Sequence, residues 1–424
     1  MFKTKFKKFN LFFFLSLSFL ILSCKTEEEK IAVIWSNRVE FASYCELFNS
    51  TQDEYKIILE YKDNPAQAIA DNEQSSEKKP DIIVGAWLKG SATRTKFANL
   101  NSLLSENKIK PENFYSALLK LGNIDDKQVL LPVSFNLPTI IFVRDAVKLE
   151  NDFIISLDDI KKLSSEYNRL TKNAYVKMGF SPSWDDNFLY ITAKGFNAGF
   201  EEEGTFFTWN QKSLENTIRY LREWTVEINN SSQAESDFKF KYLYDPPYAT
   251  LTAGRCLFQH LPGNELLMLP PEKVKNIDFR WLSYNGKTPI NDEILYAGIY
   301  SKAENKKAAE AFLTWFFTPE TQKKLLERTT QQKLKTYGFG LAGGFSSIKP
   351  VTENVFPTYY PLLLSHLPQT NSFMPPYILP SNWKKIKKEL ILPYLRESIK
   401  IEKNGNVNNF EALNKTINEW SKNN

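Results

Sequence analysis

The segment IAVIWSNRVEFASYCELFNSTQDEYKIILEYKDNPAQAIADNEQSSEKKPDIIVG, residues 31–85, decides the fold class of this 424-residue chain. Two stretches within it have apolar residues at helical spacing, and Asn37 is the expected N-cap of the first. Strands that alternate with helices predict a parallel sheet covered on both faces, which makes this an α/β protein. The β-rich runs that predict the strands are residues 31–35, 55–61 and 80–85, and the helical stretches are 41–48 and 65–73.

Helical patterns dominate the later part of the chain. They cover residues 210–227, 302–317 and 383–420, and the last is interrupted at Asn404-Gly405-Asn406. A chain of this length has room for about two or three domains with full hydrophobic cores.

Composition excludes several classes of protein. Hydrophobic residues make up 42% and charged residues 24% of the chain, close to the averages for a globular protein. The only histidines are His260 and His366, which excludes a multi-histidine metal site and leaves few starting points for histidine-based catalysis. The formal charge is +5, but four lysines lie in the first ten residues. The remainder is nearly neutral, so we expect no nucleic-acid partner.

Residues 1–23 have the three regions of a lipoprotein signal peptide. Basic residues precede an apolar run at 11–22, which has the length of a signal-peptide core and is too short to span a bilayer. Ile21-Leu22-Ser23-Cys24 resembles a bacterial lipobox, so we expect Cys24 to be diacylated and residues 24–30 to form a lipidated tether. Two acyl chains hold a protein stably, which predicts a membrane-anchored protein of the cell envelope that faces the periplasm or the exterior. The alternative is ordinary cleavage that leaves a plain thiol.

Six motifs occur in an order that resembles the extracellular solute-binding proteins of ABC importers, the sugar-type family that includes maltose-binding protein. The first motif is the opening strand, which ends in VIWS, and the resemblance extends from Ile31 to Trp420. Each motif is short, and the evidence lies in their order behind a lipobox. The other five are KPDIIV (79–84), FANLNSLL (97–104), VLLPVS with TIIFVRD (129–145), LTAGRCLF (251–258) and AAEAFLTWFFTPETQ (308–322).

The resemblance implies a two-lobe periplasmic-binding-protein fold, or Venus flytrap, with an interlobe ligand cleft and multiple hinge crossings. A ligand that touches both lobes favours the closed form, which a membrane permease then recognises. Such a monomeric receptor leaves its ligand unchanged, so we expect no enzyme activity, catalytic residue, cofactor or metal. The implied lobes are residues 31–135 with 294–335, and residues 136–293 with 336–424.

Aromatic and polar residues at strand ends and in one loop are the candidate ligand-binding residues. Ligands of doubly wound sheets bind beyond the carboxyl ends of strands. Sugars suit aromatic rings, which face their C–H groups, and amides or carboxylates, which bind their hydroxyls. Because 14% of the residues are aromatic, core packing is the alternative for each ring. The candidates are Trp35, Ser36, Asn37, Trp87, Phe135, Asn136, Trp184, Asp185 and Tyr296.

Tyr296 stands in a segment where the family often has glycines, and its ring is expected to narrow the cleft. The leading hypothesis is a lipid-anchored receptor that captures a small molecule, most plausibly a carbohydrate, by interlobe closure and delivers it to an ABC permease. The alternative is a surface lipoprotein of the same fold that acts as an adhesin or interaction scaffold. The loss of glycine near Tyr296 favours this alternative, and a ligand-driven rise in melting temperature would separate the two.

Other chemistry-bearing residues have weaker functional interpretations. Cys45 and Cys256 are expected to be separate buried thiols, although the compartment would permit a disulfide. The adjacent carboxylates Asp185 and Asp186 are expected to point apart, and Tyr359-Tyr360 has no histidine nearby to complete an iron site. A secreted hydrolase is disfavoured because the chain has no Gly-x-Ser-x-Gly motif.

Overall fold

The computed structural model describes residues 30–71, 79–172, 174–204, 206–331, 338–367, 369–400 and 413–423. The predicted signal peptide, Cys24 and most of the tether lie outside the described residues, as does the interruption at 404–406.

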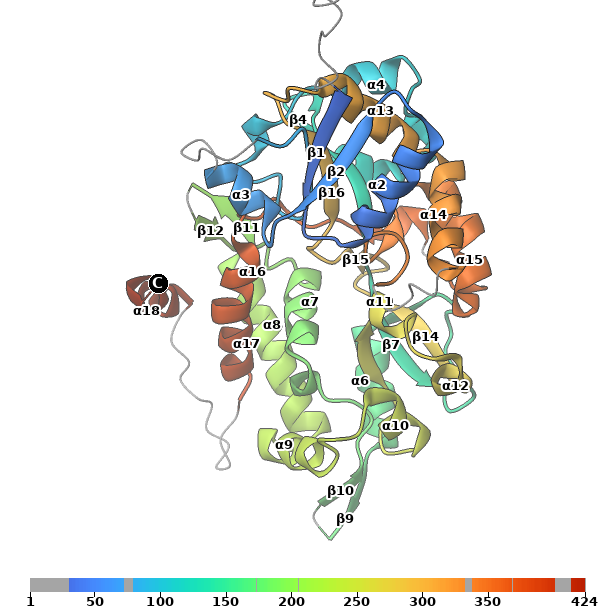
Figure 1. Cartoon of the computed structure of the whole chain (residues 1–424). Coiled ribbons are helices and arrows are strands. Elements are labelled where there is room, and N and C mark those ends of the chain that lie inside the picture. The colour runs from blue at the N-terminus through green and yellow to red at the C-terminus, as the bar shows by residue number, and fades with distance from the viewer. Residues whose placement is uncertain are drawn as a thin grey trace, which may run out of the picture.

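A six-stranded mixed sheet forms the first lobe, the upper half of Figure 1. Its strand order is β17-β6-β16-β3-β1-β2. Strand β1 pairs in parallel with β2 and β3, which confirms the parallel βαβ pattern predicted from residues 31–85, while β16 and β17 run antiparallel to their neighbours. The strands are β1 (Ile31–Ser36), β2 (Lys56–Tyr61), β3 (Ile82–Gly85), β6 (Leu131–Phe135), β16 (Leu295–Ile299) and β17 (Phe345–Ser346).

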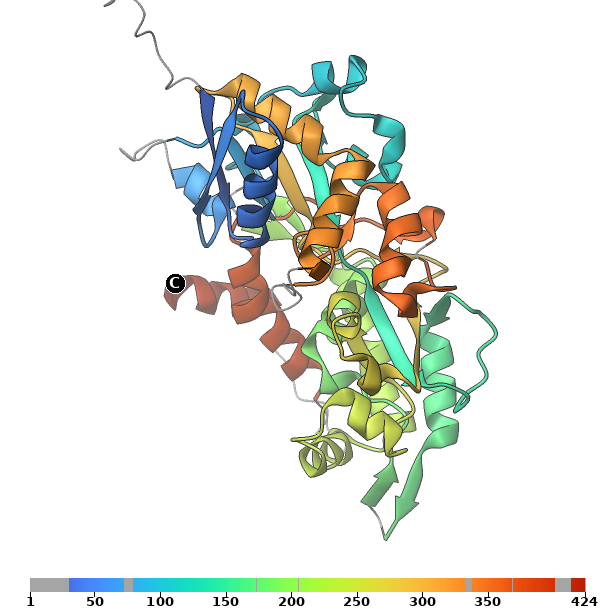
Figure 2. The ribbon, with the colours of Figure 1, turned by 45° about the vertical axis from the view of Figure 1, so that its right-hand side comes forward.

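Helices α2 and α13 pack against each other beside this sheet (Figure 2). Phe41 of α2 stacks on Phe316 of α13 with ring centroids 5.7 Å apart, and Phe48 meets Phe312 edge to face at 5.4 Å. Helix α2 begins at Glu40, and the expected N-cap Asn37 instead donates from its amide to the Asp63 carbonyl. The helices and minor strands of this lobe are α2 (Glu40–Thr51), α3 (Pro65–Asp71), α4 (Asn101–Ser105), α5 (Ser116–Lys120), β4 (Asn123–Ile124), β5 (Lys127–Gln128), α13 (Lys306–Phe316), α14 (Pro319–Gln331) and α15 (Phe356–Tyr359).

A four-stranded sheet forms the second lobe, the lower half of Figure 1, in the order β13-β7-β14-β8. Strand β7 runs antiparallel to β13 and β14, and β14 pairs in parallel with β8. Apolar residues fill both faces of β7, as expected for a strand buried between layers. The strands of this lobe are β7 (Pro138–Val143), β8 (Ile154–Ser156), β9 (Arg169–Thr171), β10 (Ala174–Lys177), β11 (Glu201–Glu203), β12 (Phe206–Thr208), β13 (Gln259–Pro262), β14 (Ile277–Ser283), β15 (Thr288–Pro289) and β18 (Phe373–Met374).

Helix α7 lies at the centre of the second lobe and packs against α17 near the C-terminus. The predicted helix at 210–227 is α8, which Asn210 caps by accepting from the Ser213 amide and which continues as a π-helical turn. The helices are α6 (Leu157–Tyr167), α7 (Asp186–Gly195), α8 (Gln211–Glu223), α9 (Ser232–Lys241), α10 (Pro247–Thr252), α11 (Gly263–Leu266), α12 (Pro271–Val274), α16 (Trp383–Ile386), α17 (Leu392–Ser398) and α18 (Leu413–Asn423).

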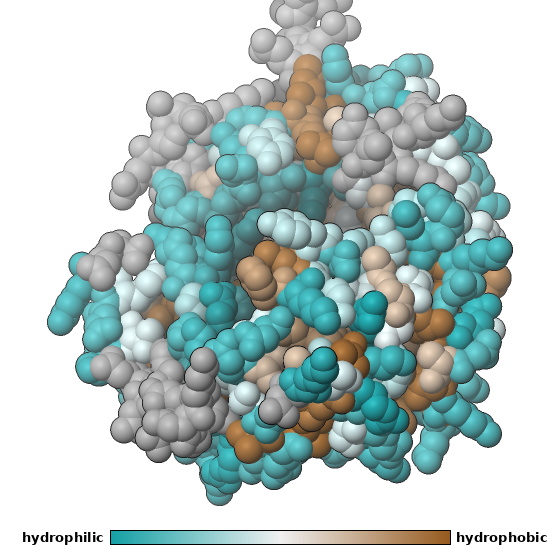
Figure 3. All heavy atoms as spheres, turned by 90° about the horizontal axis from the view of Figure 1, so that it is seen from below, coloured by the Kyte–Doolittle hydropathy of each residue, from teal (hydrophilic) through white to brown (hydrophobic). Residues whose placement is uncertain are grey.

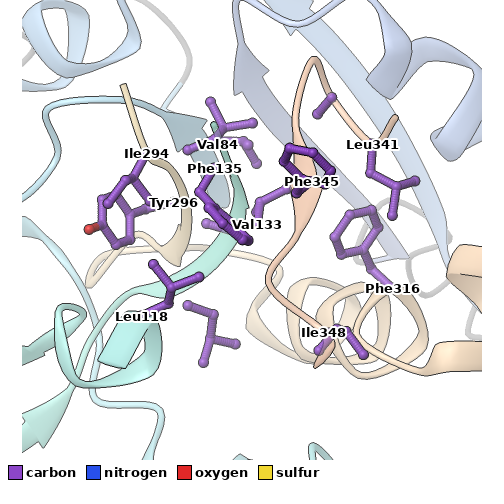
Figure 4. Close-up of a cluster of buried hydrophobic side chains, with 14 of the residues drawn as sticks. Val84, Leu118, Val133, Phe135, Ile294, Tyr296, Phe316, Leu341, Phe345 and Ile348 are labelled. Carbon is purple, nitrogen blue, oxygen red and sulfur yellow. The ribbon is translucent and has the colours of Figure 1, made fainter. Parts of the chain in front are cut away.

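Strand pairing changes one predicted lobe boundary. Residues after 335 were expected in the second lobe, but β17 pairs with β6 of the first sheet. Phe345 lies in the same hydrophobic cluster as Phe135 and Tyr296 (Figure 4), and Phe356 stacks on Phe345. The segment from Gly338 to Leu363 belongs to the first lobe because its aromatic and aliphatic side chains pack into this cluster. The chain then returns to β18, which pairs with β15.

Most hydrophobic side chains of the described chain are withdrawn into these cores. Hydrophilic residues cover most of the face seen from below, with smaller hydrophobic groups between them (Figure 3). No helix among the described residues is both long and apolar enough to cross a membrane. Cys45 and Cys256 are separate buried thiols, as predicted, and burial raises the pKa of both.

Candidate functional site

A cleft of about 310 Å³ lies where the two lobes meet. The first lobe contributes Trp87, which follows β3, and two of the chain segments that cross between the lobes contribute Asn136 and Asn291. The second lobe supplies most of the wall, from α7, β13, α11 and the helices after residue 383. The side chains that line the cleft are Trp87, Asn136, Pro138, Asn187, Tyr190, Ile191, Lys194, His260, Pro262, Asn264, Glu265, Asn291, Asp292, Glu293, Lys384, Lys387, Lys388 and Leu392.

Asn136 and Asn291 lie on the two crossings, between β6 and β7 and between β15 and β16. The Asn291 amide donates to the Asn136 carbonyl at 2.9 Å, so the two crossings are joined. The side-chain amide of Asn136 donates to the Gly343 carbonyl at 2.9 Å. The Oδ1 atoms of both asparagines are buried without a hydrogen-bond partner among the described residues. Buried acceptors are usually hydrogen-bonded, so these two oxygens lack a partner that the described residues do not supply.

His260 is the third cleft residue that has one buried polar atom without a hydrogen-bond partner among the described residues. Its Nδ1 lies 2.6 Å from Oδ2 of Asp185, and its Nε2 is buried without a partner among the described residues. Burial opposes ionisation of Asp185, but the hydrogen bond from His260 holds the pKa of this carboxyl below its ordinary value. The carboxylate therefore orients the imidazole and leaves Nε2 directed at the cleft wall.

Asp292 anchors the second crossing to the second lobe. Its carboxylate accepts from the Tyr190 hydroxyl at 2.5 Å and from the Trp383 indole at 3.3 Å, and it forms an ion pair with Lys194. Lys194 also donates to the Ile290 carbonyl at 2.8 Å. Burial raises the pKa of Asp292, but Lys194 and Lys387, together with the hydrogen bond from Tyr190, outweigh that effect and keep the pKa below its ordinary value. This network fixes the position of the crossing relative to α7 and α16.

Trp87 is the aromatic residue that the first lobe places in the cleft. Its backbone has φ of +63°, a left-handed conformation that is uncommon for a bulky residue. The indole is half-buried and packs against the cores of both lobes. Such strained positions cluster at functional sites, where the surrounding structure holds them in place. The Ser91 amide and hydroxyl secure the following loop by donating to Glu202 of the second lobe.

Trp35 and Trp184 are not in the cleft, so the prediction of a three-tryptophan site is wrong. Trp35 is only 1% exposed and its indole donates to Glu60, because it lies on an inner strand covered by helices. Trp184 lies in the second lobe, stacks on Phe238 with centroids 5.5 Å apart, and donates to the Glu235 carbonyl. Both rings serve packing, the alternative that the high aromatic content left open.

The remaining predicted residues divide between core and cleft. Ser36, Phe135 and Tyr296 are buried in the first lobe, and Figure 4 shows the last two among core side chains. The ring of Tyr296 therefore does not narrow the cleft, because its strand position directs it into the hydrophobic cluster. Of the nine predicted residues, Trp87 and Asn136 line the cleft, and Asp185 supports it through His260.

Several cleft residues escaped prediction from the sequence. His260 follows directly after the recognised LTAGRCLF motif, so extending that motif by two residues would have identified it. Asn291 and Asp292 lie close to the implied lobe boundary at residue 293 and are not among the candidate residues, although they line the cleft. Lys384, Lys387 and Lys388 also line it, and the sequence alone does not distinguish them from the solvated face of a helix. The adjacent carboxylates point apart, as predicted: Asp185 pairs with His260 and Asp186 with Arg396.

Solved structures with the same fold are numerous. The cyclic α-maltosyl-1,6-maltose binding protein of Arthrobacter globiformis aligns with a TM-score of 0.58 at 15% identity over 93% of this chain and 99% of its own. Lmo0181 of Listeria monocytogenes, in complex with cycloalternan, aligns with a TM-score of 0.57 at 14% identity, over 93% of this chain and 97% of its own. Maltotriose binding protein of Thermus thermophilus aligns with a TM-score of 0.55 at 10% identity, over 92% of this chain and 99% of its own. These likenesses confirm the two-lobe fold.

Sequence comparison identifies the family. No curated protein sequence matches the chain. The family described as bacterial extracellular solute-binding protein matches residues 43–332, which is more than half of the chain and includes strands of both sheets. This protein therefore belongs to the bacterial extracellular solute-binding proteins.

Proposed function

We propose that this protein is a lipid-anchored receptor that captures a small carbohydrate in the interlobe cleft and delivers it to an ABC permease. As a member of a solute-binding family it is a binding protein and not an enzyme. The observation that carries the proposal is the chemistry of the cleft. One indole, Trp87, lies beside three buried polar atoms without partners, on Asn136, Asn291 and His260. A sugar offers a C–H face to the indole and hydroxyls to the polar atoms.

The position of these groups also explains how binding changes the shape of the protein. Asn136 and Asn291 lie on the chain crossings, while Trp87 belongs to the first lobe and His260 to the second. A ligand that touches all four makes more contacts when the lobes approach each other. That difference in affinity shifts the population toward the closed form, which a permease can distinguish from the open one.

The structural neighbours support carbohydrates as the first ligand class to test. Their described ligands include cycloalternan, maltotriose and mannobiose, each for the protein concerned. Their identities to this chain are 10–15%, so the likeness extends to the fold and the choice of sugar rests on the cleft.

Anchoring through Cys24 rests on the lipobox and on the position of the described N-terminus. The described chain begins at Lys30, immediately before β1 in the first lobe. A tether of residues 24–30 would hold the first lobe close to the membrane and leave the second lobe outward. A receptor anchored in this way would lie in the cell envelope, facing the periplasm or the exterior.

A thermal-shift screen of the purified protein tests the proposal. Neutral and charged oligosaccharides, amino acids, short peptides and inorganic anions form the panel. A saturable rise in melting temperature with sugars alone is the expected result, since ligand that binds only the folded state stabilises it. A rise with peptides or anions alone contradicts the carbohydrate assignment. No rise with any compound favours the alternative of an adhesin or scaffold of the same fold.

A further inference from the structure

Three lysines face the cleft from one helix. Lys384 lies on α16, and Lys387 and Lys388 lie on the π-helical turn η11 (Lys387–Ile391) that continues it. Their i, i+3 and i+4 spacing puts them on the same face of the helix, toward the cleft. Lys385 lies on another face, where its ammonium is 4.0 Å from the Glu389 carboxylate. The helix therefore directs three of its four lysines inward.

The cleft-facing lysines lack the ion pairs that the outer lysine has. Among the described residues, no carboxylate oxygen lies within 4.0 Å of the ammonium of Lys384, Lys387 or Lys388. Asp292, the buried carboxylate of the cleft, is already bound by Lys194, Tyr190 and Trp383. Within the described part of the chain, the positive charge on this wall thus has no carboxylate bonded to it.

Lys387 is the most enclosed of the three. It is half-buried, and its Nζ lies 4.2 Å from the centroid of the Tyr190 ring. Burial lowers its pKa, although Asp292, Glu293 and Asp185 attract the ammonium at longer range and Lys194 repels it. A cation–π contact compensates part of the lost hydration, but an anion in direct contact would compensate more.

We infer that the cleft selects an acidic oligosaccharide, whose anionic group binds Lys387 between Lys384 and Lys388. The inference rests on the proposed function and adds the charge of the ligand to it. A carboxylate, a sulfate ester or a phosphate ester presents the same chemistry to an ammonium group. The sugar ring then lies toward Trp87, and its hydroxyls reach the free atoms of Asn136 and His260.

Isothermal titration calorimetry of the purified protein with matched sugars tests the inference. An oligogalacturonate is compared with the neutral galactose oligomer of the same length and linkage, and sulfated and phosphorylated oligomers distinguish the three anionic groups. We expect at least one acidic oligomer to bind about tenfold to a hundredfold more tightly than its neutral counterpart. Its affinity should also fall as salt concentration rises.

Two outcomes separate this inference from the proposed function. If neutral oligomers bind as tightly as acidic ones, the receptor function stands and the selectivity is overturned. If no oligosaccharide of either kind binds, the proposed function fails and the selectivity fails with it.

Substitutions of the lysines test which of them binds the anionic group of the ligand. Lys387→Gln should remove most of the preference for the acidic oligomer, measured as the ratio of the acidic and neutral affinities, while Lys385→Gln, the matched control on the outer face, should leave both affinities unchanged. If Lys387→Gln does not fold, the exposed double variant Lys384→Gln/Lys388→Gln decides. A reduced preference supports the inference, and an unchanged preference contradicts it.

Discussion

The imidazole of His260 and the carboxylate of Asp185 are 2.6 Å apart, and this contact joins strand β13 to the first turn of helix α7. The His260 side chain is only 1% exposed, yet its second nitrogen lines the cleft. Because Nδ1 bonds to the carboxylate, Nε2 is the ring nitrogen left without a partner among the described residues. The contact thereby fixes the orientation of the imidazole in the cleft wall.

Asp185→Ala should weaken ligand binding and also destabilise the protein. Asp185 is the N-cap of α7 and accepts from the Asn187 amide at 2.8 Å, so its loss removes the cap, worth about 1 kcal/mol, together with the orientation of His260. Asp185→Asn preserves the cap, since asparagine caps helices as well as aspartate does. Calorimetric titration with the best sugar should then show about twofold to tenfold weaker binding for Asp185→Asn, with a smaller loss of stability than for Asp185→Ala because the cap is kept.

Asp186→Ala is the matched control for this pair. Asp186 is the next residue in the chain, but it bonds to Arg396 and does not line the cleft. Its replacement should leave the affinity for the sugar unchanged. A loss of affinity equal to that of Asp185→Asn would show that the effect comes from the helix terminus and not from His260.

Trp87→Ala should weaken sugar binding by about 1 to 3 kcal/mol, because the indole is the aromatic surface that the first lobe offers the ligand. Titration calorimetry measures this loss directly. Replacement relieves the left-handed strain only slightly, since alanine also disfavours φ of +63°. Because the indole also packs against the cores of both lobes, the unliganded variant should lose some stability, but less than Trp35→Ala, since Trp87 is only half-buried.

Trp35→Ala provides the contrasting outcome. The ring is buried in the first lobe, so its removal leaves a cavity that should lower the free energy of unfolding by about 3 to 5 kcal/mol. Urea unfolding measures this change. If Trp35→Ala instead retains full stability and loses ligand affinity, the assignment of this ring to the core is incorrect.

The architecture could be predicted from the sequence because its signals are local and periodic. Phe41, Tyr44 and Phe48 recur at helical spacing and do bury one face of α2. Strand β17 could not be predicted, because it is two residues long and its place depends on Phe345 meeting aromatic rings that are distant in the chain. Interactions of that kind carry no local pattern.

Fewer residues of the candidate site could be predicted, because their positions also depend on tertiary contacts. A position just after a strand directs a side chain either to the ligand or to the core, depending on the tertiary surroundings. Trp35 and Trp87 both follow or end first-lobe strands, yet only Trp87 takes the left-handed backbone that turns it toward the cleft. The charges of Lys387 and Asp292 gave no indication of burial, because charged residues are usually exposed.

Asp292→Ala should lower the free energy of unfolding by about 3 to 5 kcal/mol, because it leaves the Lys194 ammonium buried and unpaired. Tyr190→Phe is the milder comparison. It removes one hydrogen bond to the same carboxylate and should lower the free energy by about 1 kcal/mol. A double variant Lys194→Met/Asp292→Ala should lose less stability than the sum of its single changes, and strict additivity would contradict a direct coupling between the two charges.

Cys24→Ala should release the protein from the membrane fraction, since the lipobox predicts that this cysteine carries the acyl chains. Metabolic labelling with a fatty acid, followed by fractionation, measures both modification and location. Cys45→Ala is the control, because Cys45 is a buried thiol of the first lobe and should not affect anchoring. Tight membrane association of Cys24→Ala, together with an unlabelled wild type, would rule out lipid anchoring at this site.

Asp278 gives the protein a pH-dependent contact between β14 and the segment that follows Leu363. Its carboxylate lies 3.0 Å from Nε2 of His366 and 3.1 Å from the Arg280 guanidinium, and it accepts from the Phe279 amide. Burial raises the pKa of this group, but these donors outweigh it and lower the pKa to about 2. The folded pKa is thus below the unfolded value of about 3.9. A depressed pKa stabilises the fold above the unfolded value, and the stabilisation is lost as pH falls toward 2.

Asp278→Asn should therefore lower the free energy of unfolding at pH 7 by an amount on the order of 2 kcal/mol. The difference from the wild type should shrink below about pH 4 and become small near pH 2, because the wild-type carboxyl is then protonated as well. Urea unfolding between pH 7 and pH 2.5 measures the trend. Asp152→Asn, whose side chain is 86% exposed and 3.9 Å from Arg280, should change stability by less than about 1 kcal/mol at any pH. A pH-independent difference for Asp278→Asn would mean that packing, and not ionisation, accounts for the role of this residue.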